Sequence, residues 1–355
     1  MTTRSRPGRG TRARATGLAA TLAAAALALT GCGGAATGNE AAVKDDGSVD
    51  LSQVTLLVGD QRGTSAQALL HAAGLDDTDY RIKWEEFTSG PPLLEALNAG
   101  SVHVGMVGNT PPIFAAAAKG RFKMVQAVSY TGKSDAIVVP KDSPITSVAG
   151  LKGKDVAVAE GSSANYDLLA QLDHAGLAYD DVNVQNLQPA DALAAFTSGH
   201  LDAWAIWDPF TSQAVTEEGA RVLADGKDLL NGLNFQVASD AALADPATTA
   251  ALKDYLGRIT RAELWAGQHQ QAWSKVWAEQ TGLSPKVTLA AAKERPVSVV
   301  QIDQSVIDSE QQMADAFTDN DLLPASVDVS GYFSARFNDV VQQAARESGQ
   351  KSGSS

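Results

Sequence analysis

Three short segments of the chain join small or polar residues to an apolar run that is spaced like the start of a helix. They are Ser89-Gly90-Pro91-Pro92, Asn109-Thr110-Pro111-Pro112 and Gly161-Ser162-Ser163-Ala164-Asn165. A helix N-terminus presents unpaired N–H groups and the positive end of the helix dipole, so each segment could bind an oxyanion. Ser and Asn are also favoured N-cap residues, and the local sequence alone is more simply explained by ordinary helix caps.

The three segments differ in the donors that they can offer. The first two place proline in the first helical turn, where it fits well but supplies no N–H group. The third has no proline, so it offers successive amides and two hydroxyl groups, and Gly161 lets an oxyanion approach the backbone. An anion is therefore expected to contact Gly161, Ser162 and Ser163. The residues expected to close over it from the opposite side are Ser89, Gly90, Asn109 and Thr110.

Two tryptophans and nearby polar residues complete the candidate site. Trp207 lies at the predicted C-terminal end of a strand, where open α/β sheets place ligands. The indole ring of Trp207 or Trp204 could contact the apolar tail of a ligand. Alternatively, both tryptophans pack in the hydrophobic core. Asp208 could bind a ligand amine or cap the next helix. Gln61 and Arg62 follow the first strand, where they could face a ligand or solvent.

The chain lacks the residue patterns of common enzymes. Cys32 is its only cysteine, so the folded part has no disulfide, no CxxC zinc site and no thiol nucleophile. No two of the five histidines occur at a metal-ligand spacing such as i, i+4. Neither a G-x-S-x-G elbow nor a Walker loop is present. We therefore predict no catalytic residue, no metal and no cofactor.

The first 31 residues have the pattern of an export signal. Five arginines without an acidic residue precede an apolar stretch at 18–29, which is too short to span a bilayer. Leu29-Thr30-Gly31-Cys32 resembles the bacterial lipoprotein signal, in which the thiol is acylated and becomes the new N-terminus. The prediction is an exported protein that a lipid on Cys32 anchors to the outer face of the cell membrane. A chance cysteine after an ordinary signal peptide is the alternative.

The composition is that of an ordinary globular protein, with 44% hydrophobic and 19% charged residues. The formal net charge is −13, and it becomes more negative once the five arginines of the signal are removed. Such a surface repels nucleic acid and anionic lipid headgroups, so no nucleic-acid partner is expected. The field of a helix N-terminus is local, and salt screens distant charges over about 8 Å, so an anion can still bind there.

The candidate residues lie in a chain that alternates between predicted strands and helices, which is typical of an α/β fold with a mostly parallel sheet. Strands are expected at 54–58, 81–87, 102–107, 123–130, 136–139, 156–159, 182–187, 203–207, 221–224 and 234–238. Helices are expected at 64–74, 91–100, 111–120, 163–176 and 190–199, after Pro209, and through most of the chain from Pro246 onward.

This pattern predicts two α/β lobes with a helical C-terminal part. Residues 51–132 and 234–343 are assigned to lobe 1, and residues 133–233 to lobe 2. Residues 32–50 are small and polar and are expected to form a flexible tether behind the lipidated cysteine. Residues 344–355 are expected to form a flexible tail. The protein is predicted to be a monomer.

Several motifs carry a resemblance to a known family. The most specific is LDAWAIWDPF at residues 201–210, and FTSGPPLLEALNAG at residues 87–100 is the longest. Over most of residues 51–340 the chain resembles the periplasmic aliphatic sulfonate-binding proteins of ABC importers, relatives of taurine- and nitrate-binding proteins. The resemblance implies a type II periplasmic binding protein fold, with two α/β lobes joined by two hinge strands. It also implies that a small organic anion, an aliphatic sulfonate, is captured and delivered to an ABC permease.

Some residues depart from the pattern of that family and leave the ligand open. Asp60 replaces an aromatic residue of many relatives, Asn109 replaces an aspartate of some, and Tyr166 is larger than its usual counterpart. Taurine, nitrate or a pyrimidine precursor are alternative ligands. An enzyme related to desulfinases is a further alternative, but those enzymes use a cleft cysteine, which this chain lacks outside position 32.

Overall fold

The computed structural model describes residues 38–349. The predicted export signal, Cys32 with its expected lipid, and the last six residues of the chain lie outside the described residues. Among the helices of residues 38–349, none combines the length and the apolar character that crossing a bilayer requires.

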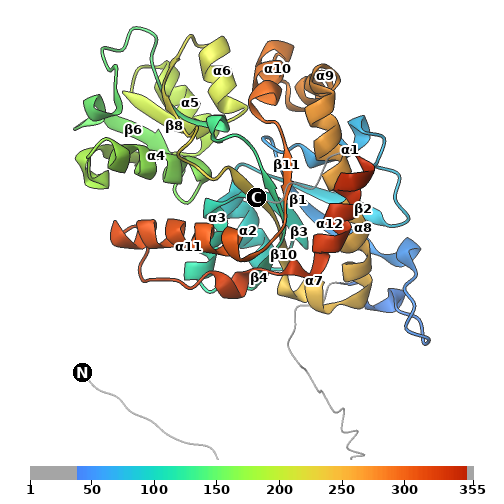
Figure 1. Cartoon of the computed structure of the whole chain (residues 1–355). Helices are drawn as coiled ribbons and strands as arrows, with labels where there is room; N and C mark the ends of the chain where they lie inside the picture. Colours follow the sequence, from blue (N-terminus) through green and yellow to red (C-terminus); the bar gives the residue numbers. More distant parts are fainter. Residues whose placement is uncertain (1–37, 350–355) are drawn as a thin grey trace, which may run out of the picture. The chain divides into compact units, whose positions relative to one another are not determined.

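Two β-sheets form the framework of the described part, one in each lobe (Figure 1). In lobe 1 the strands lie in the order β11-β4-β10-β3-β1-β2, and in lobe 2 in the order β7-β6-β8-β5-β9. The strands of lobe 1 are β1 (Thr55–Gln61), β2 (Arg81–Phe87), β3 (Val104–Gly108), β4 (Phe122–Ser129), β10 (Leu233–Ser239) and β11 (Ser298–Val300). The strands of lobe 2 are β5 (Asp135–Val139), β6 (Asp155–Val158), β7 (Asn183–Asn186), β8 (Ala203–Trp207) and β9 (Arg221–Asp225).

Helices connect the strands of both lobes, and a helical part follows the return of the chain to lobe 1. The helices between the strands are α1 (Ala66–Ala72), α2 (Gly90–Asn98), α3 (Thr110–Ala117), α4 (Ser163–His174), α5 (Pro189–Thr197) and α6 (Phe210–Thr216). The later helices are α7 (Asp240–Ala244), α8 (Pro246–Gln268), α9 (Gln270–Thr281), α10 (Pro285–Glu294), α11 (Gln304–Asp319) and α12 (Asn338–Glu347). Short 3-10 helices lie at Glu40–Ala42, Leu51–Gln53, Gly132–Ser134, Val148–Leu151, Tyr179–Asp181, Ser330–Tyr332 and Ala335–Phe337.

The predicted two-lobed α/β fold is confirmed, but the expectation of mostly parallel sheets is wrong. Strands β1, β2 and β3 pair in parallel, as do β6, β7 and β8. Strand β10 pairs antiparallel with both β3 and β4, β11 pairs antiparallel with β4, and β5 pairs antiparallel with β8 and β9. The reason is the path of the chain: each strand that enters a sheet from the other lobe runs against its neighbours.

The chain crosses between the lobes twice, once after β4 and once before β10. The two crossings touch through their backbones, since the N–H of Tyr130 donates to the carbonyl of Gly232 at 2.9 Å and that of Gly226 donates to Asp135 at 3.0 Å. A Cβ atom on Gly132 would overlap the carbonyl oxygen of Gly226. Glycine at position 132 thus permits the close approach of the two hinge segments.

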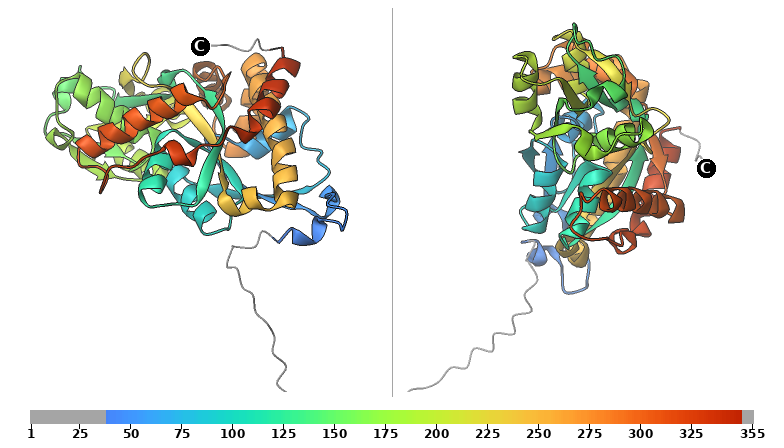
Figure 2. Two further views of the ribbon diagram at one scale, coloured as in Figure 1. Left: turned by 60° about the horizontal axis from the view of Figure 1, so that its bottom comes forward. Right: turned by 90° about the vertical axis from the view of Figure 1, so that its left-hand side faces the viewer.

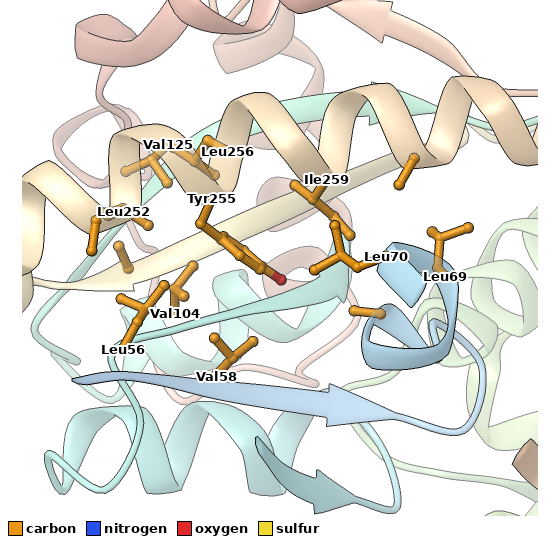
Figure 3. Packing of buried hydrophobic residues seen from close by; sticks show 14 of the residues in the cluster. Leu56, Val58, Leu69, Leu70, Val104, Val125, Leu252, Tyr255, Leu256 and Ile259 are labelled. Carbon is orange, nitrogen blue, oxygen red and sulfur yellow. The ribbon is translucent and has the colours of Figure 1, made fainter. Parts of the chain in front are cut away.

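Helix α8 covers one face of the lobe 1 sheet and forms the largest part of its core. Its buried residues Leu252, Tyr255, Leu256 and Ile259 recur at the spacing of one helix face. They pack against side chains of β1, β3, β4 and α1 (Figure 3). Each fully buried side chain of this size contributes about 2 kcal/mol of hydrophobic free energy, so this face holds α8 on the sheet.

Two later helices reach beyond lobe 1 or cover α8. Helix α11 packs its buried Met313 and Phe317 between Ile113 of α3 and Leu169 of α4, so it contacts both lobes. Helix α12 lies along α8, as the views of Figures 1 and 2 agree. Because α12 extends to Glu347 and buries Ala344 and Ala345, the expected flexible tail does not begin at residue 344.

The expected tether is also partly ordered. Residues 40–42 form a 3-10 helix, and Val43 forms a β-bridge with Val49. Asn39 is buried, and its side chain donates to the carbonyl of Thr55 at 3.0 Å and to the hydroxyl of Thr248 at 2.8 Å. The polar composition of this segment therefore does not make it flexible throughout, because Asn39 fastens it to lobe 1.

Candidate functional site

Most of the predicted site residues meet in one cavity between the lobes, which we call the central pocket. Together with the open solvent space at its mouth, its volume is about 680 Å³. It lies at the C-terminal ends of β1, β3 and β8, where open α/β sheets bind ligands. The predicted residues in its lining are Gln61, Gly90, Asn109, Ser162, Ser163, Trp207 and Asp208.

Ser89 and Thr110 were predicted to face the ligand but do not line the central pocket. Both are completely buried. The hydroxyl of Ser89 donates to Gln188 of lobe 2 at 2.9 Å, and that of Thr110 donates to Asn109 at 3.1 Å. The structure therefore does not bring these two residues to the pocket, because each hydroxyl is already used by a neighbouring side chain.

Gly161 and Trp204 also lie outside the lining of the central pocket. Gly161 has φ +70° and faces the ring of Phe114, and its N–H donates to Asn165 Oδ1 at 3.0 Å. It therefore serves the turn before α4 rather than a ligand. Trp204 is fully buried beside Phe196, so of the two tryptophans only Trp207 can wall the pocket.

The N-terminus of α4 supplies donors to the central pocket. The N–H of Ser162 donates to Ala159, and the Ser162 hydroxyl accepts the N–H of Asn165 as an N-cap. Within residues 38–349, the N–H groups of Ser163 and Ala164 have no acceptor. Ser163 lines the pocket and Ala164 does not, so the free amide of Ser163 and the helix dipole can act on an anion bound there.

Arg295 brings a full positive charge to the pocket, and the sequence predicted no role for it. It is the one arginine or lysine in the pocket lining of the described part. Its guanidinium lies 4.3 Å from the ring centroid of Tyr130 and donates to the carbonyl of Gly63 at 2.6 Å. For Arg62 the sequence left open whether it faces a ligand or solvent, and its guanidinium binds the carbonyl of Thr281 at the end of α9.

Two buried carboxyl groups face this cation across the pocket. Asp135 accepts hydrogen bonds from the hydroxyls of Ser163 at 2.6 Å and Ser134 at 3.2 Å, but burial raises the pKa of its carboxyl. Burial raises the pKa of Asp208 to about 6, although Ser212 donates its N–H to this carboxyl at 2.9 Å. Asp208 thus both caps α6 and lines the pocket, while Arg295 lowers the pKa of both carboxyls.

Contacts between the lobes surround the pocket. Besides Ser89, Thr88 of lobe 1 donates its hydroxyl to Gln188 of lobe 2 at 3.0 Å. A Cβ atom on Gly63 would lie 3.4 Å from Trp207 Nε1, and one on Gly108 would lie 3.2 Å from the Cβ of Ser163. The lobes therefore meet on more than one side of the pocket, and small residues permit their close approach.

The sequence missed several lining residues that come from the hinge segments and from the end of α10. They are Tyr130, Ser134, Asp135, Asn234 and Arg295. Nothing in their local pattern distinguishes them from strand ends and surface residues. The sequence left the role of Asp60 open; its carboxylate accepts the N–H groups of Ala66 and Gln67 and so caps α1. Among residues 38–349, no cluster of three histidine or acidic side chains could hold a metal ion.

Two lobes joined by two crossings around a pocket with anion donors define a two-lobed solute-binding protein. Comparison with known proteins identifies its family. Residues 50–272 match the model of the NMT1-like family, and the chain belongs to that family.

The relatives share most of their length with this chain. It is 36% identical to a protein of Escherichia coli (strain K12) named as an aliphatic sulfonates-binding protein, over 79% of this chain and 89% of that protein. It is 30% identical to a protein of the same name from Bacillus subtilis (strain 168), over 83% of this chain and 87% of that one. The solved structure of the alkanesulfonate-binding protein SsuA from Xanthomonas axonopodis pv. citri, bound to MOPS, matches with a TM-score of 0.73 and 36% identity. That match covers 79% of this chain and 98% of the solved one. The resemblance stated from the sequence is thereby confirmed.

Proposed function

We propose that the protein captures an aliphatic sulfonate, or a similar small organic anion, in the central pocket and delivers it to an ABC permease without changing it chemically. The observation that carries this proposal is that Arg295 and Ser163, whose N–H group has no acceptor within the described residues, line the same pocket. A sulfonate keeps its charge at physiological pH and presents three oxygens. A guanidinium and a helix N-terminus both suit such a ligand.

The names of the relatives support the ligand class, since the two reported proteins are named for aliphatic sulfonates and the solved neighbour is bound to MOPS, itself a sulfonate. Trp207 offers an apolar wall for the carbon tail of such a ligand. Because residues of both lobes line the pocket, a bound ligand favours the closed arrangement of the lobes over an open one. The permease would then recognise the closed form.

The test is a panel of ligands in a thermal unfolding assay of the exported chain. An alkanesulfonate at 100 times its Kd adds about 2.7 kcal/mol to the free energy of unfolding, whereas an uncharged alcohol of the same length should add nothing. Ser163→Asp should abolish the response, because the new carboxylate would occupy the free N–H groups of α4. Ser305→Asp places a carboxylate in the exposed first turn of α11 and is the matched control. An unchanged response in Ser163→Asp would place the site elsewhere.

We also propose that the protein is exported and held at the outer face of the cell membrane by a lipid on Cys32. This proposal is supported by the five arginines at the start of the chain, by the apolar stretch at 18–29 and by the Leu-Thr-Gly-Cys sequence. Cys32→Ala should move the protein from the membrane fraction to the soluble fraction and remove the incorporation of a labelled fatty acid. Retention of the label in this variant would contradict the proposal.

Mass analysis of the ligand after incubation tests the absence of catalysis, since a binding protein returns its ligand unchanged.

A further inference from the structure

A second cavity, which we call the inner cavity, shares part of its wall with the central pocket. The shared residues are Gly63, Thr64, Tyr130 and Arg295. Together with the open solvent space at its mouth, the inner cavity has a volume of about 410 Å³. Its other walls come from α1, α8, α9, α10 and the segment before β11. They are formed by Leu69, Glu263, Ala266, Gly267, Trp273, Trp277, Ala292 and Val297.

The walls of the inner cavity are mainly apolar. Trp273 and Trp277 are stacked there, with ring centroids 5.4 Å apart and an angle of 14° between the ring planes. The guanidinium of Arg295 lies 6.0 Å from the ring centroid of Trp277. Arg295, which lines the central pocket, therefore lies at the border of the two cavities. Aromatic and aliphatic walls of this kind fit the carbon tail of a ligand whose charged end is held elsewhere.

Glu263 is the exception in this apolar lining. Only 3% of its surface is exposed, and within residues 38–349 its Oε2 atom has no hydrogen-bond partner. Burial raises the pKa of Glu263 to about 8 although Arg295 lowers it, so the carboxyl is mostly neutral at pH 7. A buried polar group without a partner is costly, and a ligand that supplies a donor would remove that cost.

The carboxyl groups of the central pocket are in a different state. Asp135 accepts from two serine hydroxyls, and Asp208 accepts the N–H of Ser212. Their hydrogen bonds are made inside the protein, whereas Glu263 lines the inner cavity and its buried Oε2 atom has no partner within the described residues. Glu263 is therefore the carboxyl that a donor on the ligand would bind most favourably.

We propose that the inner cavity is a subsite for the tail of an aminosulfonate, with the sulfonate at Arg295 and a basic nitrogen at the tail end donating to Glu263. This proposal rests on the proposed function, because it assumes that the sulfonate end occupies the central pocket. The apolar stem between the two charged ends contacts the indole rings of Trp273 and Trp277. The ligand is thus a zwitterion, and each of its charges meets a group of opposite sign.

Binding of such a ligand is coupled to a proton. The titratable groups that act on Glu263 or feel its charge are Arg295, Tyr130 and Tyr255. Burial raises the pKa of both tyrosines, so they remain neutral at pH 7. The ligand nitrogen arrives as an ammonium ion, and Glu263 loses its proton to the buffer as the ammonium–carboxylate pair forms. At pH 7 the protein should release up to about one proton for each ligand bound.

The experiment compares 3-aminopropanesulfonate with butanesulfonate, which has a methyl group in place of the ammonium. Titration calorimetry in two buffers of different ionisation enthalpy gives both the Kd and the number of protons released. We expect about tenfold tighter binding of the amino ligand, with proton release for that ligand alone. Glu263→Gln should bring the affinity ratio close to one and stop the release. Glu310→Gln is the matched control, because Glu310 is also buried with its pKa raised to about 8, but it bonds Asn231 and lines neither cavity.

A second variant tests the cavity rather than the carboxyl. Ala292→Leu fills the inner cavity. It should raise the Kd of 3-aminopropanesulfonate and of butanesulfonate about tenfold relative to that of methanesulfonate, which is too short to reach the cavity. The tail subsite would be overturned if Glu263→Gln left the affinity ratio of the amino ligand to butanesulfonate unchanged. It would also be overturned if Ala292→Leu lowered the affinity for all three ligands equally. If the native protein failed to bind even methanesulfonate, the proposed function itself would be wrong, and the two failures are thus distinguishable.

Discussion

The central pocket and the inner cavity share Arg295 and Tyr130, yet the acidic groups of the two cavities differ in whether they have hydrogen-bond partners. In the central pocket, serine residues hydrogen-bond to Asp135 and Asp208. In the inner cavity, the Oε2 atom of Glu263 has no partner within the described part of the chain. All three acids are buried, so the difference lies in how they are partnered and not in how deeply they are placed.

The comparison shows how a protein with a negative net charge can hold an anion. Fixed donors offset part of the cost of charging the buried Asp135 and Asp208, and the guanidinium of Arg295 and the free amide of Ser163 remain for the ligand. An unpartnered and neutral carboxyl adds no repulsion until a donor arrives. The net charge of −13 is thus less important than the few buried groups around the pocket.

Removal of the shared cation should have the largest effect on binding. In Arg295→Gln the anion would keep only the helix N-terminus, so we expect a loss of about 3 kcal/mol, which is about a hundredfold in Kd. Arg336→Gln makes the same change of charge on the surface and should leave the Kd within twofold. Calorimetric titration of methanesulfonate measures both. Equal losses in the two variants would mean that Arg295 acts only through long-range charge.

The paired state of Asp208 can be tested through the pH dependence of stability. Its pKa is about 6 in the fold and 3.8 in the reference state, so the folded protein binds the extra proton between these values. Stability contributed by the protonated form is therefore present at pH 4 and lost as the pH rises through 6, by about 3 kcal/mol in total. Asp208→Asn keeps the acceptor for Ser212 and removes this loss. Urea unfolding should show a gain in stability for the variant of about 3 kcal/mol at pH 8 and about half of that at pH 5, and an equal gain at both would contradict the assignment.

Substitutions of the two tryptophans in the LDAWAIWDPF motif distinguish an effect on core packing from an effect on ligand binding. Trp204 is fully buried, so Trp204→Leu should lower the free energy of unfolding by about 2 kcal/mol while ligand affinity, corrected for folding, stays the same. Trp207 lines the central pocket, so Trp207→Leu should weaken butanesulfonate several-fold with a smaller loss of stability. Fluorescence-monitored unfolding and calorimetry measure the two effects. A reversed pattern would show that the wall of the pocket has been assigned to the wrong residue.

The sequence predicted the lobes and one side of the site for clear physical reasons. Alternating apolar runs and helical spacing locate strands and helices locally, and the donors of Ser163 follow from a proline-free helix start. Trp204 and Trp207 could not be separated in the same way, because an apolar strand with helices on both faces gives no sign of which side chain reaches a cavity. Asp135 lies at a crossing between the lobes and Arg295 at the end of a late helix, and only the fold brings them together.

The smallest expected effect concerns the contact between the lobes rather than either cavity. Gln188 of lobe 2 accepts hydrogen bonds from Thr88 and Ser89 of lobe 1, and it lies outside the lining of both cavities. Gln188→Ala removes these bonds only in the closed form, so the ligand must supply more of the free energy of closure. We expect a loss of about 1 kcal/mol, which is about fivefold in Kd, shared by methanesulfonate and longer ligands alike. A loss confined to the longer ligands would show instead that this contact shapes the pocket and does not merely favour closure.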